Sequence, residues 1–495
     1  MHGNLPGKSV RHESSDSITV RTSTKDVVWG YISTILAPIS GFILLPFLLL
    51  FLTDAEVGLW YVYIAISGWP SLLYLGLSPA FSRNIVYCLS GAKELSKSGE
   101  VEYTRGAPIN WHLLRSVMTT SRLFYSLIAC VTLLLLASIG TLYVTSVTQS
   151  SGIPSTERDI AWAVFCIAMT LEVYFQYTDI FLRGFGDIAA TSKARVFAKL
   201  LQLLVTPILL FAGLSLIGAA FGFLANSLAY RFLSAVYVRG HVAVQYGINS
   251  DSLPVKIKEV TETFLTIFYI AWRDGIVMIA MYFATQVSTL LCSAFLSLEE
   301  AGAYALLLQF ANAVFNFASS YASSSFPEFQ SAYAVKDLSR QVQIAGNCTF
   351  AYWGVSLVCT LGVTFVALPI LSLIQPSYAY DPTLYIAITI YLALLNHHSM
   401  YCSLIMCMNE IPYAASYLVS SAAGLALAAV LMSVVNLGPW GLVIGQALAQ
   451  AVYNNWYWPL YVTKRLGTTY RQVLQAGCSA FSRRIDNWRA KPTGR

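Results

Sequence analysis

Two charged residues, Arg273 and Asp274, stand side by side inside the apolar stretch IAWRDGIVMIA. Ionisable side chains are costly within apolar segments of membrane length, so they mark functional candidates. The guanidinium of Arg273 offers a fork of donors that suits phosphate oxygens, and the carboxylate of Asp274 would hold or release it. Two interpretations remain open: a site for an anionic group, or a structural ion pair whose arginine extends to the membrane surface.

A second set of polar residues follows helical spacing further upstream. Glu172, Gln176, Asp179 and Arg183 are spaced i, i+4, i+7 and i+11, which places them on one face of a helix. Glu172 or Asp179 would then carry a proton for coupling to an ion gradient. The alternative is a hydrogen-bonded seam between helices, a common use of polar residues in membranes.

Uncharged polar residues form two further stripes, and a histidine pair stands apart from them. Amide side chains suit sugar hydroxyls, but they also join membrane helices, and packing is the favoured interpretation. The stripes comprise Gln309, Asn312 and Asn316, and Gln446, Gln450 and Asn454. The pair His397-His398 has no carboxylate or thiolate partners at metal-ligand spacing, so core packing is expected and no metal site or cofactor is predicted.

The elements that must position these residues are long apolar helices. The chain has 495 residues, of which 56% are hydrophobic and 11% charged, whereas about 25% are charged in a soluble domain. Apolar runs of about 20 residues are long enough to cross a bilayer. We therefore predict an all-α, polytopic membrane protein with about twelve transmembrane helices. The expected spans cover residues 27–52, 57–82, 116–146, 160–183, 194–213, 216–238, 263–295, 301–329, 345–374, 384–408, 413–436 and 440–462.

The distribution of basic residues predicts the orientation. With both termini in the cytoplasm, all of the 30 Lys and Arg residues except Arg158 and Arg273 fall on the cytoplasmic side. The C-terminal tail is interpreted either as a basic amphipathic helix beside anionic lipid or as a disordered tail. The predicted organisation is a cytoplasmic tail (1–26), a six-helix bundle (27–240), a cytoplasmic linker (241–262), a second six-helix bundle (263–462) and the basic tail (463–495).

An internal repeat relates the two predicted bundles. Glu56-Val57-Gly58 matches Glu300-Ala301-Gly302, and Lys93-Glu94-Leu95 matches Lys336-Asp337-Leu338, at an offset of about 244 positions. With six helices in each half, the repeats are parallel and related by an axis along the membrane normal. Such a geometry predicts a central cavity between the two bundles, open to one side at a time.

The sequence also resembles a known family. GLWYVYIAISG, followed by LSPAFSRNIVYCLSGAKEL, resembles oligosaccharide flippases of the O-antigen (Wzx) type. These belong to the multidrug/oligosaccharidyl-lipid/polysaccharide (MOP) exporter superfamily, together with multidrug and toxin (MATE) exporters and lipid II flippases. The resemblance implies a V-shaped transporter with a cationic central cavity. It would move an undecaprenyl-pyrophosphate-linked oligosaccharide, a precursor of O-antigen, capsule or exopolysaccharide, to the outer leaflet of the bacterial inner membrane.

Several site residues follow from this resemblance as hypotheses. Arg273, with Asp274, would contact the pyrophosphate, while Gln309 and Asn312 would face the sugar. Arg83 and Asn84 fall within the matching motif, where a headgroup would enter, although Arg83 also suits a topology-fixing role.

The resemblance further implies the energy source and the partners. An H⁺ or Na⁺ gradient would drive transport, and a polysaccharide polymerase and a chain-length regulator are the expected protein partners, with no nucleic acid.

Two other functions are weighed against the flippase. A MATE-like exporter of small molecules is the main alternative, but the first span lacks the acidic residue that many proton-coupled exporters of this family use. A membrane polysaccharide polymerase or glycosyltransferase is disfavoured because external loops are short, and loops usually carry chemistry. No nucleotide-binding Gly-Lys-Ser/Thr motif occurs either. The chain is therefore not expected to be an enzyme.

Overall fold

Helices make up the secondary structure of the part of the chain that the computed structural model describes, and no strand occurs in that part. The described residues are 24–74, 76–95, 109–241, 244, 254–285, 287–334, 336–374, 381–408 and 410–489. The helices up to residue 239 are α1 (Thr24–Phe51), α2 (Asp54–Ile66), α3 (Trp69–Tyr74), α4 (Leu77–Leu89), α5 (Trp111–Leu135), α6 (Thr141–Val147), α7 (Ser155–Tyr174), α8 (Gln176–Gly184), α9 (Ile188–Phe211) and α10 (Ser215–Arg239).

The remaining helices complete a series of twelve passes among the described residues. They are α11 (Ile257–Thr285), α12 (Val287–Phe295), α13 (Leu298–Ala334), α14 (Leu338–Gly362), α15 (Leu368–Ile374), α16 (Pro382–Cys407), α17 (Ala414–Ser433), α18 (Pro439–Ala451), α19 (Asn454–Arg465) and α20 (Tyr470–Arg489). Eight passes are long and apolar enough to cross a membrane as they stand. The other four, α2–α4, α11–α12, α16 and α18–α19, pack alongside them. The predicted all-α, polytopic fold class is therefore confirmed.

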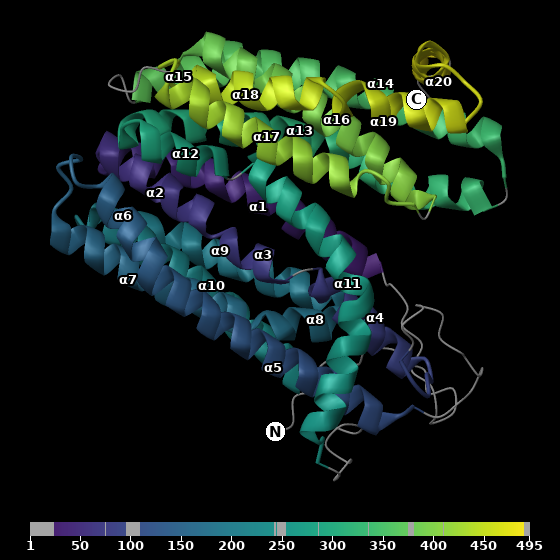
Figure 1. The fold of residues 1–495 in the computed structure, drawn as a ribbon, viewed down its shortest axis with the longest axis horizontal. Coiled ribbons are helices and arrows are strands. Elements are labelled where there is room, and N and C mark those ends of the chain that lie inside the picture. The colour runs from purple at the N-terminus through teal and green to yellow at the C-terminus, as the bar shows by residue number, and fades with distance from the viewer. Residues whose placement is uncertain are drawn as a thin grey trace, which may run out of the picture.

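Two groups of passes lie in separate layers (Figure 1). We name α1–α10 the first half and α12–α19 the second half. The Lys- and Arg-rich connections lie at one end of the passes, where α4, α8, α10 and α13 end, and we name this the basic end. The short turns that precede α2, α7, α10 and α13 lie at the opposite end, which we name the turn end.

The structure repeats between the halves more regularly than the sequence does. Asn110 caps α5 and Asp337 caps α14, and each helix then runs for 25 residues. A five-residue π-helical segment follows in both cases, Leu136–Gly140 and Val363–Ala367. Both passes end with a seven-residue helix, α6 or α15. Because these irregularities coincide, the two halves are copies of one helical arrangement.

The repeat also corrects part of the sequence alignment. Asp337 is the N-cap of α14, and its structural counterpart is Asn110, the N-cap of α5. The predicted match of 93–95 with 336–338 is therefore wrong, because the first half contains an additional connection between residue 95 and α5. The other match, of Glu56-Val57-Gly58 with Glu300-Ala301-Gly302, joins segments at equivalent positions in the two halves.

Equivalent capping boxes begin α2 and α13. Thr53 Oγ1 accepts from the Glu56 N–H at 3.3 Å, and Glu56 Oε2 accepts from the Thr53 N–H at 2.7 Å. The Ser297 and Glu300 pair makes the same two bonds at 3.1 and 3.3 Å. Each box satisfies N–H groups that the first turn of a helix leaves unpaired. The acidic turns that revealed the repeat in the sequence are thus helix starts.

The helix α11 connects the two layers. It contacts α3, α4 and α5 of the first half and α17 of the second, and Figure 1 shows it running between them. Near the basic end, Ser116 Oγ lies 3.1 Å from Thr263 Oγ1, and His112 Nε2 lies 3.1 Å from Glu259 Oε2. The helix begins at Ile257, inside the predicted linker 241–262, because the Glu259 carboxylate accepts from the Lys256 N–H at 3.3 Å.

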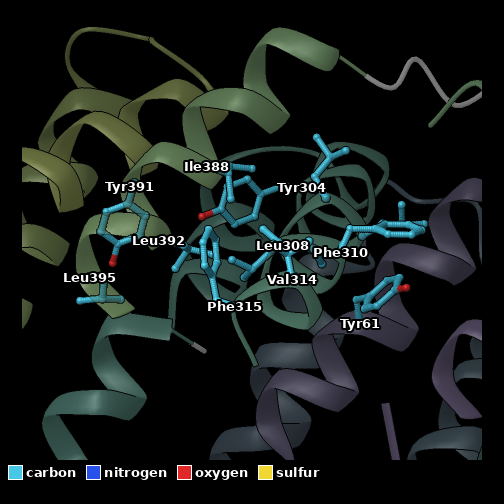
Figure 2. Packing of buried hydrophobic residues seen from close by; sticks show 14 of the residues in the cluster. Tyr61, Tyr304, Leu308, Phe310, Val314, Phe315, Ile388, Tyr391, Leu392 and Leu395 are labelled. Carbon is cyan, nitrogen blue, oxygen red and sulfur yellow. The ribbon is translucent and has the colours of Figure 1, made fainter. Parts of the chain in front are cut away.

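Direct packing between the halves is concentrated on α2 and α13. A Cβ added at Gly58 would lie 1.9 Å from the backbone oxygen of Leu298, so the two backbones touch there. Figure 2 shows the core beside this contact, which includes Tyr61 of α2, Phe310 and Phe315 of α13, and Ile388 of α16. The first and second halves therefore share a hydrophobic core.

The contact at Gly58 makes a stability prediction. Replacement of Gly58 by Ala should lower the free energy of unfolding by about 1–3 kcal/mol, because a methyl group has no room against Leu298. Thermal unfolding of the detergent-solubilised protein measures the change. Replacement of Gly354 by Ala is the control, since nothing lies within 4 Å of its added Cβ, and helix propensity favours Ala by up to about 1 kcal/mol. Equal unfolding temperatures for the Gly58→Ala and Gly354→Ala variants would contradict the close contact between Gly58 and Leu298.

Candidate functional site

A network of charged side chains lies within the first half, centred on Asp179 of α8. Asp179 is 5% exposed. Its Oδ1 accepts a hydrogen bond from the Tyr230 hydroxyl at 2.8 Å, and its Oδ2 lies 3.1 Å from Arg183 Nε. A carboxylate buried in this way is stabilised by its paired charge and its hydrogen bond. Asp179, proposed from the sequence as an ion-coupling residue, therefore lies at the centre of a cluster.

Arg231 of α10 is the most deeply buried cation of the network, at 3% exposure. Its Nη2 donates to Gln176 Oε1 at 3.0 Å and lies 3.8 Å from Glu172 Oε1. The guanidinium also lies 4.7 Å from the centre of the Tyr230 ring. Two of its nitrogen atoms, Nε and Nη1, have no hydrogen-bond partner among the described residues, and both are shielded from solvent. Buried donors without partners are rare, and an acceptor would reach these two only after the surrounding helices move apart.

Two more cations reach the network from α9. Arg195 Nη2 lies 3.5 Å from the Tyr230 hydroxyl, and its guanidinium lies 5.7 Å from the ring centre. Lys199 Nζ donates to Gln202 Oε1 at 3.0 Å, and its charge interacts with those of Glu172 and Arg195. The network thus contains more cations than carboxylates, which favours an anionic ligand. Its members are the cations Arg183, Arg195, Lys199 and Arg231 and the carboxylates Glu172 and Asp179.

A break in the fourth pass sets the geometry of this network. The predicted span 160–183 is present within the pass Ser155–Gly184, but it is not one regular helix, because α7 ends before Phe175 and α8 begins after it. The Thr178 hydroxyl and N–H both donate to the Phe175 carbonyl, at 2.8 and 3.0 Å, which forms a turn in place of a regular helix. Glu172 therefore lies on α7 and Asp179 on α8. Both carboxylates still contact the same part of α10, because Glu172 lies beside Arg231 and Asp179 is bonded to the adjacent Tyr230.

The sequence did not single out the cations of α9 and α10 as site residues. It assigned Arg195, Lys199 and Arg231 to cytoplasmic connections, but all three lie inside apolar helices. Arg231 is eight residues from the end of α10, which is about 12 Å at 1.5 Å per residue. The sequence could have indicated Arg231 as a site residue, because it lies within the predicted span 216–238, where a charge is costly.

The residues predicted to contact pyrophosphate and to receive the headgroup lie elsewhere. Arg273 and Asp274 belong to α11, and their side chains lie outside the described ones. Arg83 is exposed on α4, at the basic end of the second pass. Asn84 is half-buried and donates to the Ala80 carbonyl of its own helix at 2.8 Å. Neither Arg83 nor Asn84 belongs to the described network.

The predicted sugar-binding amides lie between the halves. Gln309 Oε1 accepts from the Tyr61 hydroxyl at 2.6 Å, and a Cβ added at Gly41 would lie 3.2 Å from Gln309 Nε2. Asn312 is half-buried about one turn further along α13. Gln309 therefore joins α2 to α13 in this conformation.

Uncharged polar residues are buried in the second half. Asn454 Nδ2 donates to Gln450 Oε1 at 2.8 Å and to Ser420 Oγ at 3.1 Å. His397 Nε2 lies 3.0 Å from the Tyr470 hydroxyl, and His398 Nδ1 lies 2.9 Å from Asn455 Oδ1. No group of three or more His, Cys, Asp or Glu residues with metal-binding geometry occurs in the described part of the chain. The two halves thus share a scaffold and differ in their polar content.

Comparison with known proteins identifies the fold. No protein-family model matches the chain, and no curated protein matches its sequence. An inward-facing multidrug resistance MATE family transporter of the MOP superfamily has a TM-score of 0.64 at 15% identity, over 90% of this chain and 100% of its own. The lipid II flippase MurJ, in an inward closed conformation, has a TM-score of 0.64 at 12% identity, over 96% and 94%. This chain therefore has the fold of MOP superfamily transporters.

The conformation can be compared in the same way. An outward-facing MATE family transporter of the MOP superfamily has a TM-score of 0.51 at 15% identity, over 90% of this chain and 99% of its own. The arrangement of helices is thus more similar to the inward-facing transporter, at 0.64, than to the outward-facing one.

The buried network predicts a large effect of removing its central carboxylate. Replacement of Asp179 by Ala should lower the free energy of unfolding by about 2–3 kcal/mol, because Arg183 and Tyr230 both lose their acceptor. Thermal unfolding in detergent measures the loss. The control is replacement of Asp159 by Ala, whose side chain is 64% exposed and paired with Arg158; it should change the stability by less than about 1 kcal/mol. Similar losses of unfolding free energy in both variants would show that the contacts of Asp179 do not stabilise the fold.

Proposed function

We propose that this protein is a flippase of the Wzx type, which moves an undecaprenyl-pyrophosphate-linked oligosaccharide from the cytoplasmic to the outer leaflet of a bacterial inner membrane. The transporter fold and the sequence resemblance support this class of function. The observation that carries the proposal is Arg231, a buried guanidinium with two unpartnered donor atoms inside a cationic network. A diphosphate is the part of such a substrate that requires these donors.

The position of the network fits entry from the cytoplasm. If the basic end is cytoplasmic, as the distribution of Lys and Arg favours, both termini are cytoplasmic. The network then lies about 12 Å inside the cytoplasmic end of α10. The two bundles would be 27–240 and 263–462, with tails 1–26 and 463–495 and a linker 241–262. A substrate entering from the cytoplasmic leaflet would meet Arg183 first and Arg231 deeper.

Proton coupling follows from the same contacts. Asp179 neutralises Arg183, and Glu172 lies beside Arg231. Protonation of either carboxyl group would release its arginine from an ion pair and leave the guanidinium available to phosphate. Glu172 and Asp179 would thus make substrate binding depend on an H⁺ gradient, and no cofactor is required.

Other predicted residues keep their proposed roles in this mechanism. Arg273 and Asp274 lie on α11, which contacts both halves, so they would add a second phosphate contact. Gln309 and Asn312 would meet the sugar when α2 and α13 separate, because Gln309 is bonded to Tyr61 in the closed arrangement. Arg83 and Asn84 would lie near the entry. A membrane polymerase and a chain-length regulator would act on the product.

A MATE-like exporter of small cations is the second candidate. The observation that favours it is the pair of carboxylates, Glu172 and Asp179, within the helical bundle. An organic cation would compete with Arg183 and Arg231 for these carboxylates. The two functions differ in the charge that they need: the flippase requires Arg231, and the exporter requires Asp179 with no contribution from Arg231.

Transport by reconstituted protein tests the proposal. In proteoliposomes, the wild type should expose an undecaprenyl-pyrophosphate-linked saccharide to an impermeant glycosidase. Replacement of Arg231 by Ala should reduce this rate by about tenfold to a hundredfold, since a lost charge-assisted bond costs about 1.5–3 kcal/mol. Replacement by Lys should restore only part of the rate, because an ammonium cannot donate as a fork.

The control is replacement of Arg340 by Ala, since Arg340 is an exposed cation paired with Glu328 and is distant in the chain from the network. Its rate should equal that of the wild type. Wild-type rates in the Arg231→Ala variant would overturn the assignment of Arg231. Absence of saccharide transport by the wild type, combined with efflux of a lipophilic cation that Asp179→Asn abolishes, would establish the exporter instead.

A further inference from the structure

The helix α20 lies across the outside of the second half at the basic end. It follows α19 after a short connection and packs on α14. Figure 1 shows α20 nearly end-on, whereas α13–α19 are seen from the side, so its axis crosses theirs at a large angle. If the passes cross a bilayer, α20 therefore runs parallel to its surface, as interfacial helices do.

The protein side of α20 is firmly held. A Cβ added at Gly477 would lie 2.2 Å from the Gly346 backbone oxygen, so the backbones of α20 and α14 touch. Val473 is fully buried. The Tyr470 hydroxyl accepts from Trp353 Nε1 at 3.2 Å. These contacts fix one face of the helix against α14, and they exclude the interpretation of 470–489 as a disordered tail.

A second apolar stripe of α20 lies beside this face and is only partly covered by α14. Leu474 is half-buried, Cys478 is exposed and Phe481 is 51% exposed. Ile485 and Trp488 continue the same helical register in the sequence. Phe481 packs on Phe350 of α14, with ring centres 5.2 Å apart, but α14 covers only part of its side chain. The exposed part of the stripe is therefore available to lipid.

Basic residues accompany the stripe. Lys464, Arg465 and Arg471 are exposed around the start of α20. Further along, the helix contains Arg483, Arg484 and Arg489, with Asp486 as its one acidic residue. A partly exposed apolar stripe with cationic flanks is the pattern of a helix that lies among anionic headgroups.

We propose that α20 is a membrane-surface helix that binds the headgroups of anionic phospholipids. The stripe of Leu474, Cys478 and Phe481 lies among the outer acyl carbons, and the arginines of α20 bind the lipid phosphates. Because α20 is joined to α14 by the Gly346 contact, bound lipid fixes the basic end of the second half at the membrane surface. This inference requires only that the passes cross a membrane, and it is independent of the transported substrate.

A spin label on the native thiol tests the depth of the stripe. Among the described cysteines, Cys130 and Cys478 are exposed, so Cys130→Ser leaves Cys478 as the exposed thiol for a nitroxide. In full-length protein reconstituted with phosphatidylglycerol, the label should be more accessible to oxygen than to a water-soluble nickel chelate. The matched control is Ser479→Cys combined with Cys130→Ser and Cys478→Ser, since Ser479 is exposed and lies about 100° around the helix from Cys478, on the side away from Phe481. That label should be more accessible to the chelate.

Lipid composition and charge complete the test. In phosphatidylcholine alone, or after replacement of Arg471, Arg483, Arg484 and Arg489 by Gln, the label on Cys478 should lose most of its preference for oxygen. An equal preference in both lipids would overturn the role of anionic headgroups. Chelate accessibility at both positions, or oxygen accessibility at both, would overturn the surface location itself. Thermal unfolding of each variant confirms that α20 is still folded on α14.

Discussion

The backbone contact of α2 with α13 at Gly58 is the constraint on which the arrangement of the halves depends. Both helices begin with a capping box, so their first turns are rigid where they meet. With no side chain at Gly58, the backbone of Leu298 lies directly against α2. Tyr61 and Gln309 extend the contact along the same helices. A change of conformation that opens this end must separate these surfaces together, because packed interfaces move as units.

The charged network shows how a membrane bundle tolerates ionised groups. Each carboxylate has a nearby cation, and Tyr230 supplies both a hydroxyl and an aromatic face. Such pairs are weak evidence for stability, since desolvation offsets much of the attraction between the charges. The excess of cations and the two unpartnered nitrogen atoms of Arg231 are therefore the observations on which the proposed anionic ligand rests.

The same repeated scaffold carries different chemistry in its two halves. The passes α5–α6 and α14–α15 share their length and their π-helical segment. The first half contains the described charge network, whereas the polar residues described above in the second half are amides, hydroxyls and buried histidines. Helix α11 contacts both halves, and α20 is added to the second half alone. The two halves thus share one helical architecture and differ in the polar residues that it carries.

The sequence alone determined the fold class, the number of passes and the repeat, because twenty-residue apolar runs and acidic helix starts are local features. It also selected Glu172 and Asp179, since charges in apolar runs are conspicuous. It could not find Arg195, Lys199 and Arg231 as their partners, because these residues lie on other helices and only packing brings them together. The break at Phe175 was equally invisible, since the apolar pattern continues through it. Which faces of the helices meet is decided by close packing over the whole bundle, which no local stretch encodes.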